Sequence, residues 1–522
     1  MADISVAAAS PAAVERARAD SPVVGISAFL LLAGTLVLGH AFGWRQGALY
    51  LLGGGLGFAL YHAAFGFTSA FRVLIADGRG AGLRAQMVML ALAALLFFPA
   101  LGHGSLLGHP VNGEAGPLGP PLLVGAFLFG VGMQLAGGCA SGTLYTIGGG
   151  STRMLVTLAF FIAGSALGAA DLPNWQAMPT LPKVSLIESF GWLPALSLSL
   201  ALFAAIAWIS ATIERRRHGR IEPIAHRAGW REVLRGPWPL VWGAVALAIG
   251  NILTLALAGR PWGVTSGFAL WGSKLWALTG ADVASWAYWA PPARAKALHE
   301  SVFADITSVM DFGIVLGALL AAGLAGRFAP VWRVPWRSLA AAAIGGVLLG
   351  YGARLAYGCN IGAYFSGIVS SSLHGWVWLA MALAGTAAVV RPRDRTIEIA
   401  RGSADRHEIV DSDALHDHEF ARAAVLAVDV MRGVRRHRTA LPRRQHIFVS
   451  RRASLDHHRA FEADHLVGDL AVVVPRDRLA RCQGQHRHPQ IGAFGDGFAA
   501  RDRVVAARST LHGVILDVRA CC

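Results

Sequence analysis

Apolar residues gather along the first 390 positions into long runs, which short polar or glycine-containing segments separate. A run of about 17–25 apolar residues is long enough to cross the hydrocarbon core of a bilayer as a helix. The runs of this length predict ten membrane-spanning helices, at residues 22–42, 46–65, 84–103, 119–138, 151–170, 190–213, 237–258, 308–326, 337–357 and 373–390. We therefore expect an all-α polytopic membrane protein embedded in a lipid bilayer.

Four further stretches are apolar but short, and they are rich in Gly together with Thr or Ser. They lie at residues 66–80, 139–150, 262–280 and 359–372. Short or irregular segments survive at membrane depth only when they are packed inside protein or line a wet cavity. These stretches therefore predict re-entrant half-helices inside the bundle.

The composition divides the chain near residue 390. Residues 1–390 contain 37 charged side chains, whereas the shorter segment 391–522 contains 40. So few charges exclude a soluble enzyme or a nucleic-acid binder for the first part. The sequence predicts a cytoplasmic segment at 1–21, two transmembrane repeats at 22–189 and 190–390, and a charged tail. We expect this tail, residues 391–522, to be a frameshifted or fused extension. Its high content of charged residues predicts that it is poorly ordered.

Arginine placement predicts the orientation, because cytoplasmic loops carry an excess of Lys and Arg. The loop 214–236 contains seven arginines and is expected in the cytoplasm, whereas the loops 104–118 and 171–189 carry few cations. Ten spans from a cytoplasmic N-terminus satisfy both constraints. Four tryptophans are expected in the interfacial belt: Trp238, Trp242, Trp376 and Trp378.

An internal repeat is the most informative feature. Residues 130–142 (GVGMQLAGGCASG) align with residues 350–362 (GYGARLAYGCNIG), with seven of 13 positions identical. A weaker pair, 65–71 (FGFTSAF) and 262–268 (WGVTSGF), occurs in the same order. Each half then holds five spans, and an odd number requires that the second half be inverted. This is the pattern of an inverted-repeat transporter, whose site lies near the midplane between broken helices.

Cys139 and Cys359 occupy matched positions in the repeated motif. The glycines around them, including Gly138 and Gly358, allow close helix approach and irregular backbone. A half-helix that starts after either cysteine directs its free N–H groups toward the midplane, which suits an anion. The alternative is that each cysteine is a small apolar core residue. Because two cysteines match, we favour a binding role.

Several polar residues are weaker candidates for substrate binding. Ser141 and Asn360 follow the cysteines and either contact a substrate or cap a local helix. Thr68 and Thr265 are repeated in the Gly/Thr motif, although Thr in lipid often bonds its own helix backbone. Arg354 lies shortly before the second cysteine and is either a functional cation or a side chain that snorkels to the outer interface.

The paired cysteine motifs, together with residues 261–272 (PWGVTSGFALWG), resemble those of the YeeE/YedE family of sulfur-compound transporters. The resemblance covers roughly residues 24–390. It implies uptake of thiosulfate or a related small sulfur anion across the bacterial inner membrane, through a pseudo-symmetric helical bundle. It also implies that thiols on a central path pass the substrate along by transient S–H hydrogen bonds. Here those thiols are Cys139 and Cys359.

The sequence departs from the family at one position. Thiosulfate carriers of this family also have a cysteine in the first-half motif, where this chain has Gly66, and Gly263 is its counterpart in the second half. Three interpretations follow: two thiols suffice, the substrate is another sulfur or selenium species, or the segments align differently.

Transport of a small sulfur oxyanion, passive or ion-coupled, is the leading hypothesis for the function. The resemblance adds a cytoplasmic sulfur-carrier protein as a candidate partner. The sequence contains no P-loop, and we expect neither enzyme activity nor a cofactor. The five cysteines include no CxxC pair, which argues against a zinc site. A membrane-embedded thiol oxidoreductase and a structural subunit remain as alternatives.

Overall fold

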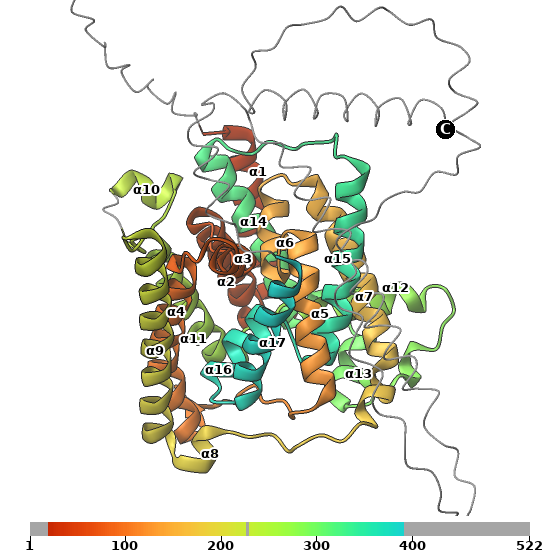
Figure 1. The fold of residues 1–522 in the computed structure, drawn as a ribbon. Coiled ribbons are helices and arrows are strands. Elements are labelled where there is room, and N and C mark those ends of the chain that lie inside the picture. The colour runs from red at the N-terminus through yellow and green to blue at the C-terminus, as the bar shows by residue number, and fades with distance from the viewer. Residues whose placement is uncertain (1–18, 226–228, 391–522) are drawn as a thin grey trace, which may run out of the picture. The chain divides into compact units, whose positions relative to one another are not determined.

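The computed structural model describes residues 19–225 and 229–390 (Figure 1). The expected tail at 391–522, and all but three residues of the expected segment at 1–21, lie outside this part. The helices are α1 (Ser21–Phe42), α2 (Trp44–Ala63), α3 (Phe67–Asp77), α4 (Ala81–His103), α5 (Pro120–Ala136), α6 (Ala140–Gly148), α7 (Thr152–Gln176), α8 (Leu186–Phe190), α9 (Trp192–His218), α10 (Trp230–Arg235), α11 (Leu240–Ala258), α12 (Thr265–Ala277), α13 (Pro292–His299), α14 (Ile306–Ala325), α15 (Trp336–Leu355), the π-helix Asn360–Phe365, α16 (Ser366–Val369) and α17 (Leu373–Val389).

The remaining regular elements are small and lie between the long helices. A two-residue hairpin, β1 (Ser105–Leu106) with β2 (His109–Pro110), follows α4. Three single-turn 3₁₀ helices, Val283–Ser285, Ala287–Trp289 and Val302–Ala304, belong to the segment between α12 and α14. The sequence pattern did not predict this structured segment.

The described residues confirm the all-α polytopic class. Nine stretches of helix in this part of the chain are long and apolar enough to cross a membrane. The tenth predicted span, 373–390, forms α17, which is apolar but has only 17 residues. Outward-facing side chains such as Leu36 and Trp208 are 73% and 70% exposed. Large apolar side chains on the outside of long helices are typical of a surface that lipid covers.

The four expected half-helices are present as short helices next to the spans. They are α3, α6, α12 and the π-helix continued by α16. A π-helix is rare and is found mostly at functional sites, because it interrupts the regular hydrogen-bond ladder. These short helices are largely buried, as membrane-depth breaks must be.

Equivalent helices of the two halves pack antiparallel, as an inverted repeat requires. A Cβ on Gly125 of α5 would lie 2.8 Å from the Gly352 carbonyl oxygen of α15, and one on Gly132 would lie 3.0 Å from the Gly345 carbonyl oxygen. The residue order therefore rises along one helix while it falls along the other. The equivalent pair α2 and α11 shows the same opposite order. Only glycine allows α5 and α15 to approach this closely.

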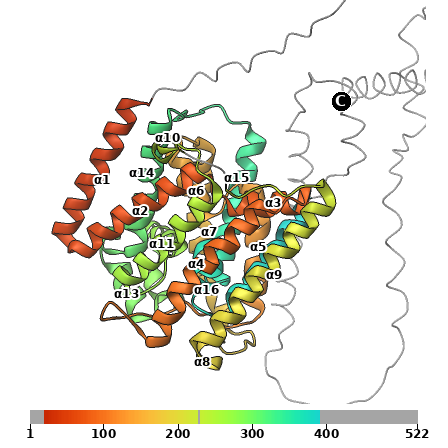
Figure 2. The same ribbon diagram turned by 90° about the vertical axis from the view of Figure 1, so that its left-hand side faces the viewer.

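The first helix of each half packs against the other half. α1 contacts α14, and α9 contacts α4, so that these outer helices are exchanged (Figure 2). Because α4 and α14 are equivalent in the repeat, the exchange follows the same pseudo-symmetry. It links the predicted repeats 22–189 and 190–390 through packing as well as through the chain.

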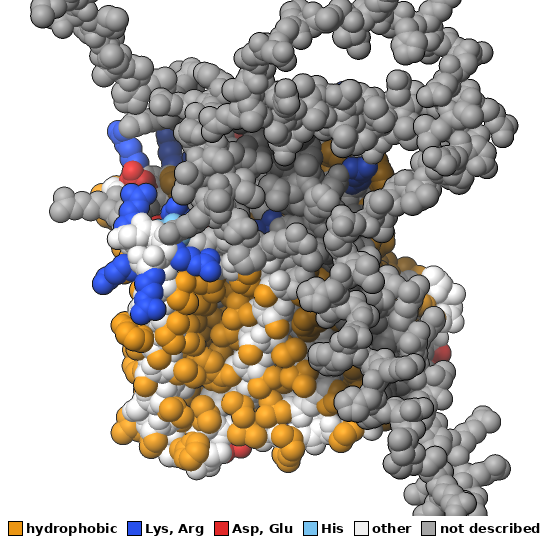
Figure 3. All heavy atoms as spheres, viewed as in Figure 1, with side chains coloured by type: hydrophobic (Ala, Val, Ile, Leu, Met, Phe, Trp, Pro, Cys, Tyr) orange, Lys and Arg blue, Asp and Glu red, His pale blue; other side chains and the backbone are white. Residues whose placement is uncertain are grey.

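Arginine side chains gather at one end of the described part. Figure 3 shows this cluster of Lys and Arg above a wide apolar surface. The last turn of α9 supplies Arg215, Arg216 and Arg217. We call this the arginine-rich end, and the positive-inside rule predicts that it faces the cytoplasm.

A buried ion pair fixes the arginine-rich end. The Arg84 Nη1 of α4 lies 2.5 Å from the Glu214 Oε2 of α9, and both side chains are nearly inaccessible. The Glu214 carboxylate also accepts hydrogen bonds from the backbone N–H groups of Gly80 and Glu222, at 3.1 and 2.9 Å. Every oxygen of this carboxylate thus has a partner, which ties α4, α9 and the following loop together.

Removing the carboxylate should destabilise the protein. Glu214→Ala leaves Arg84 buried without its counter-charge, and breaking a buried pair in this way costs about 3–5 kcal/mol. We expect a fall of that size in the free energy of unfolding, measured by denaturant titration in detergent micelles. The matched control is Glu188→Ala, because Glu188 is exposed, and it should change the value by less than about 0.5 kcal/mol. Equal effects of the two variants would contradict this role.

Candidate functional site

Each half-helix begins at a residue of the repeated motifs. Gly66 precedes α3, Cys139 precedes α6, Val264 precedes α12 and Cys359 precedes the π-helix. The prediction that half-helices start directly after the two cysteines is confirmed. The first N–H groups of these helices have no partners inside the helix, and they carry a partial positive charge.

Cys139 is buried at the N-terminus of α6 and is 2% exposed. Its Sγ accepts a hydrogen bond from the Gly142 N–H at 3.4 Å and lies 3.5 Å from the Ser141 Oγ. Its carbonyl accepts from the Thr143 Oγ1 at 2.8 Å. Gly138 comes directly before it, where a Cβ would lie 3.4 Å from the Thr143 nitrogen. The thiol is therefore held among the free N–H groups of α6.

Cys359 has the same arrangement in the second half. It is fully buried, and its Sγ accepts a hydrogen bond from the Ile361 N–H at 3.4 Å. The π-helix contacts α6, so that the motif cysteines are brought close together from positions 220 residues apart. Both are free thiols. Next to Cys359, the Asn360 side chain is buried, and neither its oxygen nor its nitrogen has a hydrogen-bond partner within the described residues.

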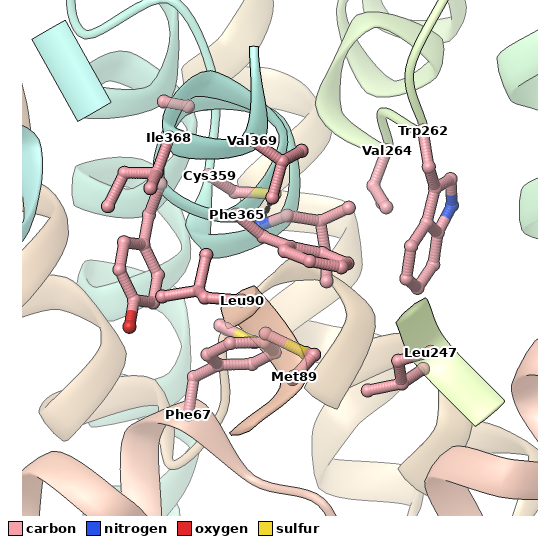
Figure 4. Packing of buried hydrophobic residues seen from close by; sticks show 14 of the residues in the cluster. Phe67, Met89, Leu90, Leu247, Trp262, Val264, Cys359, Phe365, Ile368 and Val369 are labelled. Carbon is pink, nitrogen blue, oxygen red and sulfur yellow. Dashed lines mark hydrogen bonds between the residues drawn. The ribbon is translucent and has the colours of Figure 1, made fainter. Parts of the chain in front are cut away.

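Aromatic and aliphatic side chains surround Cys359. Figure 4 shows it beside Phe365 and Val369, with Phe67 and Leu90 close by. Buried polar groups in such surroundings normally have partners, and the unpartnered side chain of Asn360 therefore needs an explanation. A transient ligand at Asn360 and the thiol would provide it.

One tryptophan prediction is wrong. Trp378 is fully buried rather than interfacial, and its ring stacks on Tyr364 of the π-helix with centroids 6.1 Å apart. Phe67 meets the same Tyr364 ring edge-on at 6.1 Å. The π-helix places Tyr364 against α17, and this covers the face of α17 that a simple span would turn to lipid.

A cavity of about 760 Å³ lies at the end opposite to the arginine-rich one. Its wall comes from the segments that precede α5, follow α7, surround α12 and follow α15. It is lined by five cationic and three acidic side chains, namely Lys183, Arg260, Arg294, Lys296, Arg354, Glu114, Glu300 and Asp305. We call it the large cavity. The excess of cations suits an anionic ligand.

Glu114 modulates this charge. Burial raises the pKa of the Glu114 carboxyl, while the positive charges of Arg260 and Arg294 oppose that shift. A carboxyl with a raised pKa is neutral over a wider pH range than usual. The large cavity thus becomes more positive as the pH falls through this pKa.

Glycines form the floor of the large cavity. Gly263, Gly358 and Gly362 all line it, and a Cβ built on Gly362 would lie 4.0 Å from the Gly263 Cα. A Cβ on Gly263 would meet nothing within 4 Å. Cys359 lies between two of these floor residues in the sequence. Cys359 itself is fully buried, but Gly358, directly before it in the sequence, lines the cavity.

Arg354 points into the large cavity instead of snorkelling to the interface. It is 8% exposed, and it donates hydrogen bonds to the Tyr288 hydroxyl at 2.7 Å and to the Thr265 Oγ1 at 2.6 Å. Its Nε has no hydrogen-bond partner within the described residues. A buried guanidinium that retains an unused donor is suited to bind an oxyanion.

A smaller cavity, of about 180 Å³, lies at the arginine-rich end. It is lined by Gly66, Ser69, Arg79 and Gln86, among others. The Gln86 Oε1 accepts a hydrogen bond from the Tyr364 hydroxyl at 3.2 Å, and the Gln86 Nε2 has no partner within the described residues. We call it the small cavity. Tyr364, which packs against Phe67 and Trp378, belongs to the π-helix that begins after Cys359 and thus links the small cavity to the buried centre.

In the first half, a cation from another helix, Arg72 of α3, binds the residue that aligns with Arg354. Gln134 aligns with Arg354, and its side-chain oxygen accepts a hydrogen bond from the Arg72 Nε at 2.9 Å. The Gln134 Nε2 in turn donates to the Thr68 carbonyl at 3.3 Å, while the Thr68 hydroxyl has no partner within the described residues. The cation that the motif alignment lacks is thus supplied from α3.

The structure brings the predicted candidates into three places. Gly263, Thr265, Gly358 and Arg354 line the large cavity; Cys139, Cys359, Gly138, Ser141 and Asn360 form the buried centre; Gly66 lines the small cavity, and Thr68 is buried beside it. The sequence interpretation missed Arg72, Tyr288 and the loop cations of the large cavity. No motif marks those residues, because they come from separate segments that only the fold assembles.

The chain is similar in sequence to several named transporters. The chain is 26% identical over 356 residues to the thiosulfate transporter TsuA of Spirochaeta thermophila, covering 63% of this chain and 92% of that protein. It is 28% identical over 356 residues to the thiosulfate transporter TsuA of Escherichia coli, covering 63% of this chain and 89% of that protein. The probable transporter YedE of E. coli is 34% identical over 142 residues, which are 27% of this chain and 34% of YedE.

A family whose description is sulphur transport matches residues 62–388, which include both cysteine motifs and both cavities. With the apolar helices, this match identifies a multi-pass bacterial membrane protein, and an inner-membrane location fits its transporter relatives. The chain therefore belongs to the sulphur transport family, the YeeE/YedE family that its cysteine motifs resemble.

Proposed function

We propose that this protein takes up thiosulfate from the large cavity to the small one, past Cys359 and then Cys139. The observation that carries the proposal is the glycine floor: Gly358, which lines a cavity rich in cations, directly precedes the buried Cys359. The two named thiosulfate transporters, which match most of their own length, support the same substrate.

Capture begins in the large cavity. Thiosulfate carries two negative charges at neutral pH, and it must lose water to approach the thiols. The unused donor of Arg354 and the free N–H groups at the start of α12 compensate for that loss. Thr265 and Tyr288 hold the guanidinium in place, since each accepts one of its hydrogen bonds.

Passage through the centre uses neutral donors. Each thiol directs its S–H to the anion while its sulfur still accepts from the Gly142 or the Ile361 N–H, and Asn360 offers a further N–H. Weak donors suit a transport path, because binding must be strong enough to admit the ion and weak enough to release it. The aromatic rings around Tyr364 must move for the anion to reach the small cavity.

Two thiols suffice in this mechanism. Gly66, at the position where related thiosulfate carriers have a cysteine, lines the small cavity, where the anion already meets water. A cytoplasmic sulfur-carrier protein as recipient rests on the family resemblance alone. The chain itself acts as a transporter and not as an enzyme in this proposal.

Growth on thiosulfate tests the proposed substrate. A bacterium that lacks its own sulfur-uptake systems should grow on thiosulfate as sole sulfur source when it expresses the full chain. Without the chain, it should grow only on a reduced source such as cysteine. Failure to grow on thiosulfate, with membrane insertion verified by immunoblotting, would contradict the proposal. Growth on sulfite, or uptake of a radiolabelled selenium compound, would then identify the alternative substrates.

A further inference from the structure

Asp311 is a buried acid on α14 that the proposed path does not use. Its side chain is completely inaccessible, and neither carboxylate oxygen has a hydrogen-bond partner within the described residues. An ionised carboxylate without partners at membrane depth is unfavourable, and such a group becomes neutral instead. In this conformation Asp311 therefore holds a proton.

Its position is directly behind the anion site. A Cβ on Gly267 of α12 would lie 3.0 Å from the Asp311 Oδ2. Gly267 is two residues after Thr265, which accepts the hydrogen bond from Arg354. The first turn of α12 thus separates the acid from the cation of the large cavity.

A row of polar side chains leads from the large cavity toward Asp311. Asp305, Ser308 and Asp311 are spaced by three residues and so share one face of α14. Asp305 lines the large cavity and accepts a hydrogen bond from the Ser308 Oγ at 2.7 Å. The Ser308 Oγ itself accepts from the Trp271 Nε1 at 2.8 Å. A proton from the large cavity thus has acceptors in Asp305 and Ser308, and the last step to Asp311 requires a side-chain movement, since no hydrogen bond joins Ser308 and Asp311 in this conformation.

Other titratable groups near α14 do not neutralise Asp311. The elements packed against α14 carry His40, Arg45, Tyr50, Tyr61, His62, Tyr145, Arg231, Glu232, Arg235 and Lys274. Lys274 donates to the carbonyls of Leu298 and Glu300, and the Tyr50 hydroxyl donates to the Leu30 carbonyl. Asp305, six residues earlier in the chain, is itself an acid and cannot neutralise an ionised Asp311.

A proton that accompanies the dianion would reduce the opposition of the membrane potential to its entry. A membrane potential of 100 mV, negative inside, opposes each entering negative charge by about 50-fold at equilibrium. A carrier without coupling would therefore exclude a dianion about 2,500-fold. One accompanying proton reduces this exclusion to about 50-fold, and an inward pH gradient lowers it further.

We propose that Asp311 is the proton-binding residue that couples the entry of the sulfur anion to the inward movement of one proton. The inference rests on the proposed function. In each cycle the carboxylate binds a proton that arrives along Asp305 and Ser308, and it releases that proton toward the arginine-rich end. Asn at position 311 imitates the permanently neutral acid.

The experiment compares the full chain with Asp311→Asn in proteoliposomes whose membrane potential is clamped at zero. Two quantities are measured: exchange of internal for external radiolabelled thiosulfate, and accumulation driven by a pH gradient of one unit, alkaline inside. The full chain should show exchange and about tenfold accumulation, because one proton accompanies each anion. Asp311→Asn should keep the exchange and lose the accumulation. Asp282→Asn, an exposed control in the same half, should behave as the full chain.

Three outcomes would overturn the inference: exchange without accumulation in the full chain, accumulation in Asp311→Asn equal to that of the full chain, or loss of exchange in a monodisperse Asp311→Asn. Absence of exchange in the full chain would instead refute the proposed function, and this inference with it. If Asp311→Asn fails to fold, the external pH during thiosulfate uptake by the full chain tests the coupling instead. Adding thiosulfate must make the outside solution more alkaline, and a constant external pH during uptake would overturn the coupling.

Discussion

Cys359→Ala should lower the initial rate of thiosulfate uptake by about 10- to 100-fold, and Cys139→Ala should have a similar effect. Each change removes the S–H donor that meets the anion in a buried, apolar place. A hydrogen bond to a charged group contributes about 1.5–3 kcal/mol, which corresponds to this range of rates. The measurement is uptake of radiolabelled thiosulfate into cells that express matched amounts of each variant.

The control for this prediction is a cysteine outside the repeated motifs. Cys482→Ala should leave the rate unchanged, since that cysteine lies outside the part of the chain that carries the site. Near-normal uptake by both motif variants would show that the thiols are only packing residues. Trapping of Cys139 with Cys359 as a disulfide during turnover would favour the oxidoreductase alternative, because a redox pair must cycle through that bond.

Arg354→Gln should raise the thiosulfate concentration required for half-maximal uptake by about 10- to 100-fold. The substitution removes a buried charge that faces the large cavity, and charge-assisted hydrogen bonds to an oxyanion have energies of this order. The maximal rate should change less, because the thiols remain. Concentration dependence of uptake in proteoliposomes measures both parameters separately.

Two variants test whether the charge of Arg354 is responsible. Arg354→Lys keeps the charge but not the planar fork, and it should recover part of the affinity. Arg45→Gln removes an exposed arginine that does not line the large cavity, and it should have no effect on half-saturation. An unchanged half-saturation in Arg354→Gln would show that Arg354 holds only Tyr288 and Thr265 in place.

The spans could be predicted from the sequence because one physical property decides them. The predicted run 237–258 became α11 at Leu240–Ala258, and 308–326 became α14 at Ile306–Ala325. Lipid allows only long apolar helices with satisfied backbones, so that hydropathy alone locates them. The repeated cysteine motif likewise predicted the start of α6 and of the π-helix, because both breaks need glycine and a residue that caps the next helix.

The rest of the site depends on contacts between distant segments. Tyr288 belongs to a segment that no motif marks, yet it holds Arg354 across 66 residues of sequence. Trp378 is a residue type that is common at membrane interfaces, but Tyr364 of the π-helix covers it. Asp311 is a single acid within an apolar run, and only its packing behind α12 reveals that it has no partner. Sequence patterns record local preferences and cannot show which side chains remain unsatisfied after folding.

Uptake of radiolabelled thiosulfate by proteoliposomes containing the purified full chain tests the central claim most directly. We predict saturable uptake that excess unlabelled thiosulfate abolishes, that excess sulfate leaves intact, and that the double variant Cys139→Ala/Cys359→Ala does not support. Uptake that sulfate suppresses as well as thiosulfate does, or that the double variant retains in full, would contradict a thiosulfate path through the two thiols.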